Sequence, residues 1–162
     1  MNIFLLIAGI LLLALSVYLI VRPHFPSVIA SYGGLWALSL GDWLDVPMRM
    51  LTYWGAMVVV VLIITSMQQR TLVKATQGMV HICLGALTGM ALGAVGGYAL
   101  MVVGAAVGAT LGAVVFARTP GGRGLDFPSQ RFLQYLCAKG LPAVISVSII
   151  GIAILIAAVE YE

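Results

Sequence analysis

The stretch from residue 77 to residue 117 is apolar, contains no Asp, Glu, Lys or Arg, and is rich in glycine. As one straight α-helix it would be about 60 Å long, whereas the hydrocarbon core of a bilayer is only about 30 Å thick. The stretch therefore predicts two membrane-spanning helices, at 78–95 and 98–116. We place the break at Gly96-Gly97, because paired glycines are its weakest helix-forming point. The pattern Gly-Ala-x-x-Gly-x-x-Leu-Gly-Ala-Val occurs at 85–95 and again at 104–114, which supports two equivalent crossings.

The composition excludes an ordinary soluble domain. Of the 162 residues, 62% are hydrophobic and only 8% are charged, and the mean hydropathy is +1.15, whereas soluble domains are about 25% charged. The net charge of +3 does not indicate nucleic-acid binding, because in a membrane protein the position of each cation carries the information. Cys83 and Cys137 form no CxxC or Cys/His cluster, so we expect no metal site, disulfide or cofactor.

The chain divides into six apolar segments, which predict a single all-α membrane domain over residues 1–162. The expected spans are 2–21, 27–41, 49–67, 78–95, 98–116 and 140–159. Pro23 and Pro26 end the first span. The second reaches only about 21 Å if helical, so a full crossing and a re-entrant segment both remain open. Before the last span, the segment 129–139 has the pattern of a short helix lying in the membrane interface.

Charge placement predicts the orientation of these spans. With the N-terminus outside, an even number of crossings also leaves the C-terminus outside, and of the eight cations only Arg49 then lies outside. The other seven fall on the cytoplasmic side: Arg22, Arg70, Lys74, Arg118, Arg123, Arg131 and Lys139. Such a bias is typical of cytoplasmic loops. We expect Lys139 to extend to the inner interface.

The glycines of the two central spans recur at every fourth position, as a glycine zipper. The positions are Gly85, Gly89, Gly93 and Gly97, followed by Gly104, Gly108 and Gly112. This spacing leaves a bare stripe along one helix face, and small residues let helices approach closely in lipid. We expect the stripe to pack helices, within one chain or between chains. The alternative is that it leaves room for a ligand such as a lipid chain.

Four features together resemble a known family. They are a P-x-x-P break after the first span, a Trp-rich turn after the second, the glycine-zipper hairpin, and a basic loop before the final span. Over residues 2–158 they look like the small bacterial membrane proteins of domain-of-unknown-function family 456, although Ser27 stands where that family usually has glycine. The resemblance implies the architecture and a bacterial inner-membrane location, and it implies no activity.

Four arginines on the predicted cytoplasmic side are the main candidate binding residues: Arg22, Arg118, Arg123 and Arg131. Arginines at the ends of spans commonly anchor topology. A cluster of them instead forms a site for an anionic headgroup, because guanidinium groups match phosphate oxygens. Pro23, Pro26 and Gly96 are helix breaks, and the proline break is either a loop or a re-entrant ligand site. His81 is either structural or coupled to protons.

Two functional classes remain, and neither is an enzyme, because no catalytic motif is present. The first is a protein that binds or moves an anionic amphiphile or small solute across the membrane. The second is a structural or accessory subunit whose glycine-rich helices mediate oligomerisation or packing with a partner membrane protein. No acidic residue lies in the middle of a predicted span, which argues against a conventional ion-coupled transporter. Expected partners are membrane lipid and a second copy or another membrane protein, with no nucleic acid.

Overall fold

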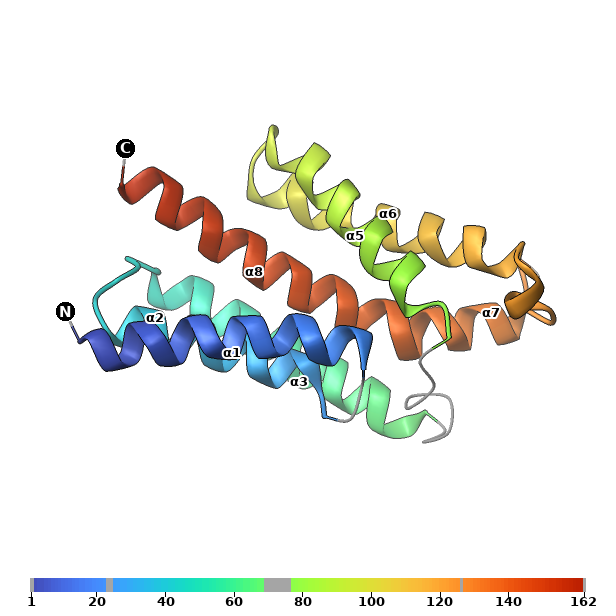
Figure 1. The fold of residues 1–162 in the computed structure, drawn as a ribbon, viewed down its shortest axis with the longest axis horizontal. Coiled ribbons are helices and arrows are strands. Elements are labelled where there is room, and N and C mark those ends of the chain that lie inside the picture. The colour runs from blue at the N-terminus through green and yellow to red at the C-terminus, as the bar shows by residue number, and fades with distance from the viewer. Residues whose placement is uncertain (1, 23–24, 69–76, 126, 162) are drawn as a thin grey trace.

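The protein is helical throughout the part of the chain that the structure describes. The computed structural model describes residues 2–22, 25–68, 77–125 and 127–161, and these contain no strand. The long helices are α1 (Ile3–Val21), α2 (Ser27–Leu40), α3 (Met48–Met67), α5 (Met79–Ala94), α6 (Tyr98–Ala117) and α8 (Leu141–Glu160). The short ones are η1 (Pro120–Gly122), α7 (Gln130–Tyr135) and the π-helical turn η2 (Leu136–Gly140) (Figure 1).

Each of the six expected spans corresponds to a helix. Four helices are long and apolar enough to cross a membrane: α1, α3, α6 and the continuous segment Gln130–Glu160. The other two, α2 and α5, are apolar but shorter, with 14 and 16 residues. The all-helical, membrane-compatible architecture predicted from composition is therefore confirmed.

Local chemistry sets the helix ends. Asn2 caps α1, because its side-chain oxygen accepts a hydrogen bond from the Phe4 N–H at 3.2 Å. The break between α5 and α6 falls at the glycine pair, as predicted. Gly97 has φ of 99°, a backbone conformation that residues with a Cβ rarely adopt.

The sequence predicted a separate short helix in the membrane interface over residues 129–139, and the structure corrects this prediction. Instead of forming a separate element, α7 leads through η2 directly into α8, giving one helical segment of 31 residues from Gln130 to Glu160 (Figure 1). Two of its aromatic side chains pack on protein, whereas Leu133 is 57% exposed. Phe132 is fully buried, the Tyr135 ring stacks on Phe116 with centroids 5.9 Å apart, and the Tyr135 hydroxyl donates to the Gln77 carbonyl at 2.8 Å.

The position of Lys139 corrects a second prediction, because we expected its side chain to extend to the inner interface. Its exposed fraction is only 2%. The π-helical turn η2 that carries it contacts α3, α5 and α6, so the lysine lies inside the junction of these helices.

The helix α8 occupies the centre of the molecule. It contacts α1, α2 and α3 on one side and the α5–α6 hairpin on the other (Figure 1). One core cluster lies toward α2 and α3 and includes Leu35, Trp54 and Ile149. The other lies toward α5 and α6 and includes Ala109 and Val147. The hairpin therefore packs on α8 by one face and leaves its other face uncovered by the described chain.

Both chain termini lie at the same end of the bundle (Figure 1). Hydrogen bonds join the pieces there: the Trp43 indole N–H donates to the Asn2 carbonyl at 3.1 Å, and the Asp45 N–H donates to the Glu160 carboxylate at 2.7 Å. Arg22 and Arg118 follow directly after α1 and α6, at the opposite end. Arg70 and Lys74 lie outside the described residues. The described chain therefore separates its termini from its arginine-rich loops.

Candidate functional site

The helices α5 and α6 meet through their glycines. A Cβ added to Gly85 would meet the carbonyl oxygen of Gly108, and one added to Gly89 would meet that of Gly104. The same closeness relates Gly93 to Leu100, and Gly112 to His81. No side chain fits at these positions unless the two backbones move apart. The glycine contacts thus lie inside one chain.

Gly97 differs from the other six glycines of the predicted stripe. A Cβ there would have nothing within 4 Å, and its positive φ places it in the turn between the helices. Its role is conformational, so its assignment to the packing face is wrong. Gly96 lies beside it and a Cβ there would meet the Leu100 side chain.

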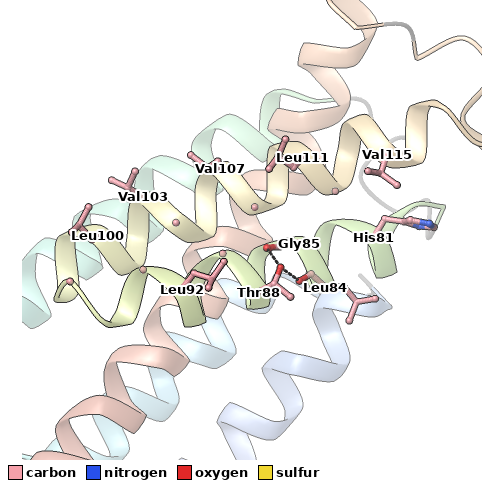
Figure 2. A pocket seen from close by; sticks show the side chains of 16 residues that line it. His81, Leu84, Gly85, Thr88, Leu92, Leu100, Val103, Val107, Leu111 and Val115 are labelled. Atoms are coloured by element: carbon pink, nitrogen blue, oxygen red, sulfur yellow. Dashed lines mark hydrogen bonds between the residues drawn. The ribbon is translucent and has the colours of Figure 1, made fainter.

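A groove of about 740 Å³ runs along the hairpin on the face away from α8. Glycines from both helices line it together with two ridges of larger side chains (Figure 2). The ridge from α5 consists of His81, Leu84, Thr88 and Leu92, and that from α6 of Leu100, Val103, Val107, Leu111 and Val115. The glycines form the floor of the groove. Because they have no side chains and the two backbones approach closely, the floor lies below the side chains of the two ridges.

The lining of the groove is almost entirely hydrocarbon. The hydroxyl of Thr88 donates to the carbonyls of Leu84 and Gly85, at 2.9 and 3.0 Å (Figure 2), so it is already engaged within its own helix. The ridge side chains are open to the outside: Leu111 is 59% exposed and Val103 55%. Such a surface matches an apolar chain and offers little to a polar solute.

A second, polar pocket of about 430 Å³ lies at the end of α6. It is lined by Ala117, Arg118, Thr119, Pro120, Arg123 and Gly124. Both arginines are exposed. Among the described residues that line this pocket, the charged side chains are the two arginines. The C-terminus of α6 adds partial negative charge, which favours a cation at the position of Arg118.

A tight turn after α6 brings the two arginines together. The Gly122 N–H donates to the Thr119 carbonyl at 3.0 Å, and the Thr119 hydroxyl donates to the Phe116 carbonyl at 2.6 Å. A Cβ on Gly122 would meet the Phe116 carbonyl. This glycine therefore lets the chain fold back against the helix end, with Arg118 before the turn and Arg123 after it.

The groove and the arginine pocket are separate, but they follow one another along α6. Val115 lines the groove, and Ala117 and Arg118 line the pocket. Positions 100, 103, 107, 111, 115 and 118 follow the three- and four-residue steps of one helix face. Arg118 therefore continues the α6 ridge by one turn. The opposite end of the groove, at Gly96 and Leu100, has no charged residue in its lining.

The other two candidate arginines do not line this pocket. Arg22 and Arg131 are both exposed. Arg22 follows α1, where its backbone N–H donates to the Tyr18 carbonyl at 2.9 Å, and Arg131 lies in α7. The structure thus brings together two of the four predicted arginines. The ridge on α6 that connects them to an apolar surface was missed, although its helical spacing is visible in the sequence.

The break between α1 and α2 is anchored in the protein. Pro26 directly precedes α2, and Pro23 lies outside the described residues. Ser16 in α1 donates its hydroxyl to the Ser27 carbonyl at 3.2 Å, and the hydroxyls of Ser27 and Ser146 lie 3.0 Å apart, linking α2 to α8. These buried groups are engaged with one another, which favours a structural turn over a ligand site.

Comparison with known proteins gives no functional assignment. No family model, curated protein or solved structure matches the chain. The resemblance to family 456 stays a prediction. Among the described residues no group of three or more His, Cys, Asp or Glu side chains is placed to hold a metal ion. Function is therefore argued from the groove and the arginine pocket.

Proposed function

We propose that this protein is a multi-pass bacterial inner-membrane protein that binds an anionic amphiphile. The headgroup contacts Arg118 and Arg123, and the hydrocarbon tail lies in the groove between α5 and α6. The observation that carries this proposal is the relative position of the two surfaces: helical spacing places Arg118, which lines the pocket, one turn beyond Val115, which lines the groove, on one face of α6.

The chemistry of the two surfaces is complementary to the two parts of an amphiphile. Guanidinium groups form paired, charge-assisted hydrogen bonds with phosphate oxygens, and basic pockets beside membrane helices bind anionic lipid headgroups. The groove offers dispersion contacts to a hydrocarbon chain along its full length. A small polar solute would use only the pocket and leave the groove unexplained.

The proposed orientation follows from the charges. We place both termini outside, so that Arg22, Arg118, Arg123 and Arg131 face the cytoplasm in agreement with the positive-inside rule. The headgroup then lies at the cytoplasmic surface. The glycine zipper holds α5 and α6 together, and this packing sets the depth of the groove.

The alternative function is a structural or accessory role, in which a helix from a partner or a second copy fills the groove. The exposed ridges would accept a helix as well as a lipid. The six glycines of the stripe other than Gly97 give this alternative little support, because the backbone that each of them approaches belongs to the same hairpin. The arginine pocket at the end of the groove favours a charged lipid.

Native mass spectrometry of the gently solubilised protein tests the proposal. We expect a stoichiometric anionic lipid on the wild type and its loss from the double variant Arg118→Gln, Arg123→Gln. The matched control is Arg22→Gln, Arg131→Gln, which removes the same charge from the same end but spares the pocket. Equal loss from both variants would show nonspecific attraction, and a lipid-free oligomer would favour the structural role.

A further inference from the structure

We infer that the preferred ligand is a single-chain lipid monophosphate whose tail passes the membrane midplane, the chemical class of the polyprenyl phosphates. This inference rests on the proposed function and specifies its ligand. It follows from two independent features, the length of the groove and the charge of the pocket at its end.

The groove is longer than one leaflet. On α6 it extends from Leu100 to Val115, which is about 22 Å of helix. Half of the hydrocarbon core is only about 15 Å. The acyl chains of a bilayer phospholipid anchored at Arg118 end near the midplane, so lipid of the opposite leaflet would cover the part of the groove around Leu100 and Leu92. A single ligand anchored at Arg118 that follows the whole groove therefore needs a tail that passes the midplane.

The shape of the groove favours one chain. Its two walls are single ridges on neighbouring helices (Figure 2). Its floor is the line where Gly85 meets Gly108 and Gly89 meets Gly104. A diacyl lipid would keep its second chain outside this line of contact. A single-chain lipid places all of its hydrocarbon against the protein.

The pocket favours a phosphate monoester. Two guanidinium groups line it, and none of the described residues that line it carries a carboxylate to bind the ammonium group of a zwitterionic lipid. The Thr119 hydroxyl already donates to the Phe116 carbonyl. A terminal phosphate carries about −1.5 to −2 charge near neutral pH, which nearly balances the two positive charges of the arginines. A phosphodiester carries one negative charge and would leave one of the two positive charges unbalanced.

Binding of three probes to the purified full-length protein tests the inference: undecaprenyl phosphate, farnesyl phosphate and phosphatidylglycerol. We expect undecaprenyl phosphate to bind about tenfold more tightly than farnesyl phosphate, through the added tail contacts. Phosphatidylglycerol should bind more weakly than undecaprenyl phosphate. Loss of all binding in Arg118→Gln, Arg123→Gln locates the headgroup.

A groove-filling variant tests the position of the tail. Val103→Trp blocks the half of the groove far from the arginines, and should weaken the binding of undecaprenyl phosphate more than that of farnesyl phosphate, so that the preference for the long chain is lost. The control is Val59→Trp on α3, because Val59 is 54% exposed, compared with 55% for Val103, and does not line the groove. It should change neither affinity.

These experiments distinguish failure of the ligand assignment from failure of the proposed function. Equal affinity for both polyprenyl phosphates, still dependent on the arginine pair, would overturn the long-tail inference and leave the proposed function intact. Tighter binding of phosphatidylglycerol would overturn the monoester inference in the same way. Binding of every probe without regard to Arg118 and Arg123 would overturn the proposed function itself, as would a dimer that dissociates in Val103→Trp.

Discussion

At the scale of single residues, close backbone contact explains why glycine occupies the α5–α6 stripe. The four-residue spacing in the sequence predicted that stripe, and Gly85, Gly89 and Gly108 lie on it. Gly97 shares the spacing but lies in the turn. Spacing alone cannot separate the two roles, because a helix-breaking glycine in register with the stripe looks the same in one sequence.

A methyl group at Gly89 should therefore destabilise the protein. Its Cβ would meet the backbone carbonyl of Gly104, and overpacking of this kind costs about 1–3 kcal/mol. The control Gly33→Ala places a Cβ 3.7 Å from Leu12, an ordinary contact, and should be neutral or slightly stabilising. Thermal unfolding followed by circular dichroism in one detergent compares them, and equal Tm values would contradict the packing account.

At the scale of elements, the sequence predicted each long helix but misjudged α7. Its apolar side, which includes Phe132 and Tyr135, has the same pattern whether it faces lipid headgroups or other helices. The deciding contacts, with Gln77 and Phe116, come from distant parts of the chain. An amphipathic pattern therefore identifies a helix with a buried side without identifying what covers that side.

Interhelical hydrogen bonding gives a second test at this scale. Ser146→Ala removes the partner of the Ser27 hydroxyl, and we expect a loss of about 0.6 kcal/mol, typical of such bonds in membranes. The hydroxyl of Ser148 is buried without a partner in the described part of the chain, so Ser148→Ala should be neutral or stabilising. The measurement is unfolding in a denaturing detergent, and a larger loss for Ser148→Ala would contradict the assignment.

At the scale of the whole molecule, the order of the six apolar segments predicted which loops share an end, whereas the central position of α8 was not predictable. In a soluble protein the most apolar helix is usually the most buried. Here lipid-facing helices are equally apolar, so α1 and α8 look alike in sequence although α8 is far more buried. The sequence left open whether the glycine stripe packs helices or leaves room for a ligand, because an apolar face open to lipid resembles an apolar face inside the bundle.

The topology predicts where a fused reporter will work. With both termini outside, alkaline phosphatase fused after residue 162 should be active and a green fluorescent protein at the same point should be dark. Fusions truncated after Arg123 should give the reverse, because the proposed orientation places that loop in the cytoplasm. A fluorescent C-terminal fusion would invert the orientation and place the arginine pocket on the outer surface.

The central claim is that a lipid occupies the groove, and photo-crosslinking from Val107 in intact membranes tests it most directly. Val107 lies in the middle of the α6 ridge and is 54% exposed, so a photoreactive amino acid there reports whatever fills the groove. The control position is Val59 on α3, with the same exposed fraction of 54%. The account predicts a phosphate-bearing lipid adduct at Val107 that Arg118→Gln, Arg123→Gln abolishes, and only bulk lipid at Val59. A crosslink from Val107 to a second copy or another protein, insensitive to the arginines, would contradict it.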